Sequence, residues 1–197
     1  MRIDTLDELR ALYGAPPRGA ILKVADRLTP AYRRMMEAAP FTALATVGPD
    51  GMDCSPRGDR GQVAFALDER RIAIPDRRGN NRLDTLENIV LDGRIACLFL
   101  VPGCNECLRI AGRAHLTTKL CERFAVDGKR PATVIVVEIH AVYFQCARAL
   151  IRSNLWNARV DRALLPTAGE MTASVDPHFD AAPYDAALPA RQRETLY

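Results

Sequence analysis

Three arginines gather at one turn in the middle of the chain, between a short apolar run and an amphipathic segment. They are Arg77, Arg78 and Arg82, and the same turn contains Gly79 and two asparagines. Free N–H groups at the start of a helix and the planar guanidinium fork both suit phosphate oxygens. The turn therefore indicates a site for a phosphate-bearing ligand, and a solvated basic turn is the competing interpretation.

The residues on either side of this turn predict a strand before it and a helix after it. Residues 71–74 form the apolar run. Residues 80–91 follow a helical pattern, with Asn80 expected as the N-cap and Asp84 in the first turn, where an acid is favoured. The apolar positions of this helix are predicted to share one face: Leu83, Leu86 and Val90.

Composition places the chain among ordinary globular proteins. Its 197 residues suit one domain with helical additions, and 48% of them are hydrophobic. A net charge of +3 is too small to indicate nucleic-acid binding. No apolar run reaches the roughly 18 residues that span a bilayer, so no membrane partner is expected. The charged first residues lack the apolar core of a signal peptide, which favours a cytoplasmic location.

The cysteines and histidines do not indicate a metal centre. Cys104 and Cys107 form a C-x-x-C pair, but no second pair follows at a spacing that would complete four zinc ligands. The pair also lies between two predicted strands, whereas a thioredoxin-like site needs a strand-to-helix junction. Only 3 histidines are present, and they are scattered. We therefore expect no metal.

The order of predicted elements divides the chain into three parts. Residues 1–40 are expected to form a helical extension, residues 41–146 the core, and residues 147–197 a helical segment and tail that is mobile from Asp176 onward. The core strands are predicted at 41–47, 52–55, 63–67, 71–74, 94–101, 106–118 and 132–145. Tight turns between them favour antiparallel pairing, and the scarcity of covering helices favours a closed or partly closed barrel.

Several ordered motifs together resemble those of the pyridoxamine 5′-phosphate oxidase-related, FMN-binding split-barrel proteins. The residues that carry the resemblance lie at 41–51, 54–59, 74–82, 108–114 and 146–156. The resemblance implies a mainly β protein with flanking helices, built on a six-stranded antiparallel split barrel. It further implies a homodimer with FMN in clefts between the subunits.

The resemblance also assigns roles to particular residues. Four residues of the basic turn would contact the phosphate and ribityl chain: Arg77, Asn80, Asn81 and Arg82. Ser55 and Arg57 would lie beside the isoalloxazine ring, and backbone groups at Pro75 and Asp76 would face its polar edge. Arg152 and Trp156 would come from the other subunit.

The activity implied by the resemblance is an FMN-dependent oxidoreductase with a nicotinamide, NAD(P)H, or oxygen as the other redox partner. Flavin carries out hydride and electron transfer itself, so no catalytic side chain is assigned. Residues 170–197 lack the arginine-containing substrate motif of true pyridoxamine 5′-phosphate oxidases, which leaves the substrate open. The alternatives are a deazaflavin-dependent reductase and a non-catalytic protein that binds or stores flavin or haem.

Overall fold

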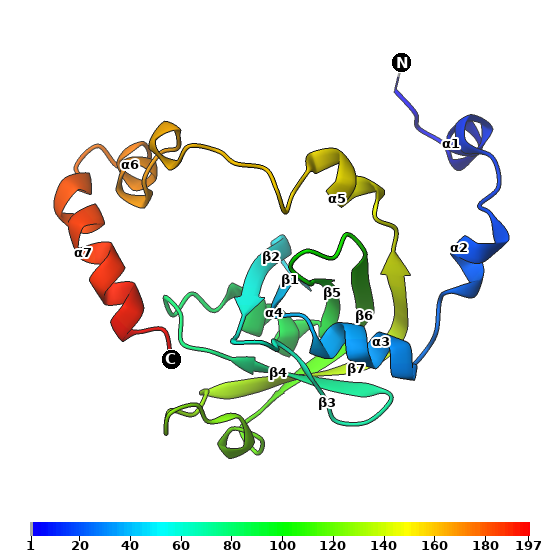
Figure 1. The fold of residues 1–197 in the computed structure, drawn as a ribbon, viewed down its shortest axis with the longest axis horizontal. Helices are drawn as coiled ribbons and strands as arrows, with labels where there is room; N and C mark the ends of the chain where they lie inside the picture. Colours follow the sequence, from blue (N-terminus) through cyan, green and yellow to red (C-terminus); the bar gives the residue numbers. More distant parts are fainter. Residues whose placement is uncertain (1) are drawn as a thin grey trace.

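The computed structural model describes residues 2–197, and its centre is one antiparallel sheet of seven strands (Figure 1). The order across the sheet is β2-β1-β5-β6-β7-β4-β3. The strands are β1 (Phe41–Gly48), β2 (Gly51–Gly58), β3 (Phe65–Ala66), β4 (Arg71–Asp76), β5 (Arg94–Leu100), β6 (Cys107–Thr117) and β7 (Thr133–Gln145). In Figure 1, β1, β2 and β5 run across the direction of β3 and β4, as in a split barrel. The predicted class is confirmed, with the two-residue β3 as a seventh strand.

Alternation of side chains explains how the strands enclose a core. In β1, Thr42, Leu44 and Thr46 are buried, while the residues between them are only partly covered. Strand β4 differs because residues 72–75 are buried on both faces. Ile72 and Ile74 belong to the main core, whereas Ala73 joins a smaller cluster beside Phe124. The sheet therefore has a covered outer surface where β4 and β7 meet.

Only some of the helices pack against this sheet. Figure 1 shows α3 and α4 lying on it, while the others stand on extended segments around it. The helices are α1 (Leu6–Tyr13), α2 (Arg18–Leu22), α3 (Pro30–Glu37), α4 (Asp84–Leu91), α5 (Arg148–Ser153), α6 (Ala168–Ala173) and α7 (Ala181–Glu194). The tail predicted to be mobile from Asp176 onward contains the helix α7, and its mobility stays a prediction. Across residues 2–197 no helix is both long and apolar enough to cross a membrane.

The helix after the basic turn differs from its prediction in two respects. It begins at Asp84, and Asn80 is not its N-cap; instead Asn80 Oδ1 accepts a hydrogen bond from the backbone N–H of Arg82 at 3.0 Å. The face buried against the sheet carries Thr85 and Ile89. Val90, predicted to share an apolar face with Leu83 and Leu86, is 73% exposed. Part of the apolar stripe of α4 is therefore on the outer surface.

Glycine at position 112 is required by a close approach of two strands. A bulge in the β6–β7 pairing lies between Ala111 and Gly112, and a Cβ at position 112 would collide with the carbonyl group of Glu138. Backbone atoms cannot move aside as a flexible side chain can. We expect Gly112→Ala to lower the free energy of unfolding by about 3 kcal/mol in urea titrations.

Gly79→Ala is the matched control, because a Cβ there meets no atom within 4 Å and the backbone has an ordinary φ. Its free energy of unfolding should stay within about 1 kcal/mol of the original. Equal losses in the two variants would show that the close approach at the bulge is not what constrains position 112.

Candidate functional site

The candidate site lies where the ends of β2 and β4 approach the start of α4. Strands β2 and β4 are not neighbours in the sheet, since four other strands separate them. Their side chains nevertheless meet, because the sheet curls: Arg57 Nε on β2 lies 3.5 Å from Asp76 Oδ1 at the end of β4. This ion pair therefore joins the two halves of the split barrel.

Arg57 carries an unsatisfied hydrogen-bond donor inside this junction. Its side chain is 20% exposed, and its Nε is buried without a hydrogen-bond partner among residues 2–197. The Nη1 of Arg57 donates to the carbonyl of Pro56 at 3.0 Å. A buried charged donor without a hydrogen-bond partner is costly, and the ion pair with Asp76 offsets part of this cost.

The acid opposite Arg57 has a perturbed proton affinity. Burial raises the pKa of the Asp76 carboxyl, and the positive charge of Arg57 partly offsets this rise. The Asp76 side chain is 20% exposed. It therefore takes up a proton at a higher pH than an aspartate in water does.

A network of hydroxyl groups fixes the start of α4 against β2. The buried Thr85 Oγ1 donates to Asp53 Oδ2 at 2.6 Å, and Ser55 Oγ donates to the same oxygen at 2.9 Å. The hydrogen bond from Thr85 is the main reason why the pKa of Asp53 is lowered. Ser55, predicted to contact a cofactor, thus also supports the position of α4.

Arg77 is held by contacts within the chain. Its Nε donates to Asp59 Oδ2 at 2.7 Å and its Nη1 to the carbonyl of Phe124 at 2.6 Å. The side chains of Arg77 and Asp59 are only 13% and 7% exposed. Tyr197 OH donates to the other oxygen of Asp59 at 2.7 Å, and its ring lies 5.4 Å from the guanidinium carbons of both Arg60 and Arg77.

The rest of the basic turn is exposed and available. Arg82 Nε donates to Asp84 at 2.5 Å and its side chain is 77% exposed. Asn81 has a φ of 61°, a left-handed conformation that asparagine tolerates better than most residues. Residues 77–83 have no helical or strand structure, so they form a loop between the end of β4 and α4. We call this segment the phosphate loop, after the ligand that the sequence predicts for it.

The structure brings most of the predicted site residues to one place. Ser55 and Arg57 lie on β2, Asp76 ends β4, and the phosphate loop follows directly. Pro75 lies buried within β4, where it pairs with Val134 of β7. Its side chain therefore belongs to the sheet, and a ligand contact at this position would fall to neighbouring backbone groups.

Arg152 and Trp156 lie in a different part of the chain. Trp156 Nε1 donates to the carbonyl of Cys104 at 2.8 Å, which ties the segment after α5 to the β5–β6 turn of the same chain. The side chain of Arg152 is exposed and makes no hydrogen bond or ion pair within the described residues. Nothing in the single chain brings either side chain to the phosphate loop.

Several residues of the site were missed in the sequence. Asp53, Ser55 and Arg57 alternate along β2, and this period of two could have placed Asp53 on the same face. Thr85 could have been found once α4 was known to begin at Asp84. The contact of Tyr197 with Asp59 joins residues 138 positions apart and had no local signal.

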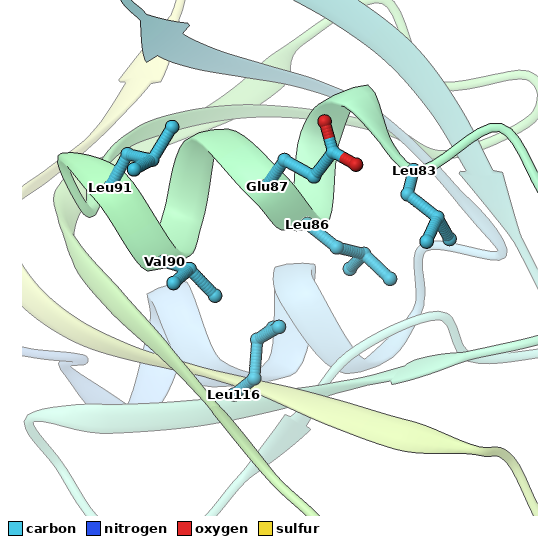
Figure 2. Close-up of a pocket in the computed structure, with 6 residues that line it drawn as sticks. All are labelled: Leu83, Leu86, Glu87, Val90, Leu91 and Leu116. Carbon is cyan, nitrogen blue, oxygen red and sulfur yellow. The ribbon is translucent and has the colours of Figure 1, made fainter.

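An apolar groove runs along α4 beyond the phosphate loop. Figure 2 shows its lining side chains, and the groove has a volume of about 420 Å³. They are Leu83, Leu86, Glu87, Val90 and Leu91 from the loop end and α4, and Leu116 from β6. We call this feature the α4 groove. Glu87 is its one charged lining residue.

The cysteines form no disulfide, and all 6 are free. Cys107 is buried in β6, and its register partner is Gln145, so Cys146 lies close by. Within residues 2–197 no group of three or more His, Cys, Asp or Glu side chains is arranged to hold a metal ion.

A curled antiparallel sheet with a basic loop at the junction of its two halves defines a split-barrel protein with a candidate anion site. The family model described as pyridoxamine 5′-phosphate oxidase matches residues 28–146. The chain therefore belongs to the pyridoxamine 5′-phosphate oxidase family. No curated protein matches the sequence.

Several solved structures are similar to this chain at low sequence identity. HupZ from Group A Streptococcus has a TM-score of 0.50 and 15% identity, covering 59% of this chain and 93% of HupZ. An FMN-binding protein from Syntrophomonas wolfei has a TM-score of 0.45 and 15% identity, over 58% of this chain and 83% of that protein. An F420 reductase has a TM-score of 0.43 and 21% identity, over 58% of this chain and 98% of that protein. At 15% identity the likeness to HupZ concerns the fold alone.

Proposed function

We propose that the protein is an FMN-dependent oxidoreductase that works as a homodimer, with FMN bound at the junction of β2, β4 and the phosphate loop. The observation that carries this proposal is the buried Arg57 Nε, which has no hydrogen-bond partner among residues 2–197 although it lies 3.5 Å from Asp76 Oδ1. It lies at the closing point of the barrel, next to the phosphate loop. Membership of the pyridoxamine 5′-phosphate oxidase family favours a flavin as the missing acceptor.

The phosphate loop is suited to the phosphate end of FMN. Arg82 is exposed on this loop, and the side chains of Asn80 and Asn81 are exposed beside it. A phosphate carrying nearly two negative charges is matched by one or two guanidinium groups and backbone N–H donors. Arg77 contributes differently, because its bonds to Asp59 and Phe124 hold the start of the loop in place.

Arg57 and Asp76 would act at the ring end of the cofactor. Bound FMN supplies hydride and electron transfer, and the protein positions it and sets its electrostatic surroundings. Arg57 would place a fixed positive charge beside the ring, and its Nε, which lacks a hydrogen-bond partner among residues 2–197, would donate to the ring. Asp76, whose pKa is raised by burial, holds a proton at a higher pH than an exposed acid and can then donate a hydrogen bond.

The second subunit would complete the site. Arg152 is exposed and free of partners among residues 2–197, so it is available to a neighbouring copy. Arg152 and Trp156 of the partner subunit are proposed to lie beside the flavin, with NAD(P)H as the electron donor. The substrate is not assigned, and the cytoplasmic location stays a prediction.

The ligand itself provides the first test. Heating the purified protein and analysing the released small molecule by mass spectrometry should yield FMN, and the native protein should show the visible absorption band of a bound flavin. Bleaching of that band by NADPH would support an enzyme over a storage protein. Release of a deazaflavin or haem, or failure of the apoprotein to bind added FMN, would overturn the assignment.

Arg82→Ala should raise the dissociation constant of FMN by about tenfold or more, since it removes a charge-assisted hydrogen bond to phosphate. The fold should be unaffected, because Arg82 is exposed and its one ion pair is with Asp84. Quenching of flavin fluorescence during titration measures the constant. Arg71→Ala is the matched control: this arginine is also exposed and paired with an aspartate, but it starts β4. Unchanged affinity in Arg82→Ala would contradict the role of the loop.

A further inference from the structure

The N-terminal segment is folded but has no tertiary support in the single chain. Residues 2–22, which we call the N-terminal arm, are all exposed. The arm contains α1, whose start is fixed by a capping box between Thr5 and Glu8. No residue of α1 or α2 is buried. Helices this short are marginal in water, so their stability is expected to come from packing against another surface.

The exposed side chains of α1 form a face suited to packing. Leu6, Leu9 and Tyr13 follow the i, i+3, i+7 spacing of helices that dock into grooves. Each is more than 40% exposed. Just after the arm, Ala25 exchanges two backbone hydrogen bonds with Val142, at 2.9 and 2.8 Å. The arm is therefore fixed at its root on β7, while α1 stands well away from the sheet (Figure 1).

The total exposed surface of the chain also indicates that its projecting segments pack against another protein surface. The chain exposes 13282 Å². A compact protein of 21.8 kDa would expose about 9300 Å², so the excess is about 4000 Å². Obligate dimers bury roughly 2000–5000 Å² in total, which two such chains could supply from this excess.

The α4 groove offers a surface of matching chemistry on the same chain. Five of its six lining residues are apolar, and Val90 and Leu91 are strongly exposed there (Figure 2). The exception is Glu87, and the last turn of α1 carries an arginine, Arg10. An apolar helix face with one cation thus fits an apolar groove with one anion.

We propose that the N-terminal arm is exchanged between subunits, so that α1 of one copy docks into the α4 groove of a second copy. The inference rests on the homodimer of the proposed function and adds the segments that make the contact. In the single chain, α1 does not pack into the α4 groove of the same chain, because no residue of α1 is buried. Because α4 directly follows the phosphate loop, docking would also cover the far end of the helix that positions this loop.

Hydrogen exchange on the unmodified full-length protein tests the docking directly. At concentrations where light scattering finds a dimer, the backbone amides of residues 10–13 should exchange at least tenfold more slowly than unfolded peptides do, as expected of a packed helix. Amides of α4 facing the groove should gain protection together with them as the dimer forms. A dimer in which α1 exchanges at unfolded rates would overturn the inference and leave the dimer itself intact.

Two single substitutions and their mixture identify the contact and its donor. Leu9→Lys places a charge on the apolar face of α1, and Val90→Glu places a charge in the α4 groove. Each substitution should remove the protection of the α1 amides against hydrogen exchange. Mixing the two proteins should restore protection to the α1 of the Val90→Glu chain, because its intact arm meets the intact groove of the other chain. If α1 instead docked within its own chain, mixing would not restore its protection. That result would overturn the exchange between subunits.

Met52→Glu is the matched control for the groove, since Met52 is 79% exposed on β2, outside the groove. It should leave the protection of α1 unchanged, and an equal loss in this variant would contradict the assignment. FMN content is measured in every sample. If the protein is monomeric and still binds FMN, the exchange of arms is contradicted and the flavin site is not. If it is dimeric and binds no FMN, only the flavin site is contradicted.

Discussion

Replacing Arg57 with alanine is expected to raise the dissociation constant of FMN by about a hundredfold, more than any other single change in the site. A charge-assisted hydrogen bond contributes roughly 1.5–3 kcal/mol, and about 3 kcal/mol corresponds to a hundredfold change in affinity. The upper end applies here because Arg57 Nε is buried, so water cannot replace the lost donor. The measurement is a fluorescence titration of apoprotein with FMN.

The same substitution has a second effect through Asp76. Since the charge of Arg57 lowers the pKa of Asp76, its removal should raise that pKa further above the value of a free aspartate. An acid whose pKa is higher in the folded protein than in the unfolded chain stabilises the fold fully at pH values below its unfolded-state pKa. This stabilisation is lost as the pH rises through its folded-state pKa. As the pH falls through the raised pKa of Asp76, Arg57→Ala should therefore become more stable to unfolding. Its FMN affinity should also recover in part, because the protonated acid no longer repels the anionic cofactor.

Arg57→Lys and Asp76→Asn separate these contributions. Lysine keeps the charge but lacks the planar fork, so it should recover only part of the lost affinity. Asp76→Asn removes the titrating group, and adding it to Arg57→Ala should abolish the pH dependence. If Arg57→Ala bound FMN as tightly as the original protein, the central assignment of the site would be lost.

The barrel strands could be predicted from the sequence because they are alternating or short apolar runs, most of them bounded by recognisable turns. Gly48 to Gly51 illustrates this, since the predicted hairpin there became β1 and β2 in register. The start of α4 was mispredicted because an asparagine oxygen can satisfy either a helix end or a tight turn. Asn80 does the second.

Long-range contacts explain the remaining differences. The apolar stripe of α4 predicts a buried face, but the chain buries Thr85 and Ile89 and leaves Val90 outside. A stripe that packs against another subunit has the same pattern as one that packs against the core, so periodicity cannot distinguish them. The role of Arg77 depended on Asp59 and Tyr197, which the sequence places far apart.

Loss of the Asp59 carboxylate is expected to have the largest effect on stability. Asp59 is 7% exposed, and it accepts hydrogen bonds from both Arg77 and Tyr197. Asp59→Ala would leave the guanidinium of Arg77, only 13% exposed, without its carboxylate partner. Breaking a buried ion pair from one side costs about 3–5 kcal/mol, so urea titrations should show a loss of that size.

Three further variants assign this loss to its cause. Asp26→Ala breaks an exposed pair with Arg70 and should cost no more than about 1 kcal/mol. Tyr197→Phe removes a single hydroxyl bond and should also cost about 1 kcal/mol. Adding Arg77→Met to Asp59→Ala should recover stability, because no unpaired charge then remains buried. A double variant less stable than Asp59→Ala would mean that Arg77 supports the fold through its bond to Phe124. The phosphate loop would then owe its position to that carbonyl, and FMN affinity should fall with Arg77→Met while Asp59→Ala retains it.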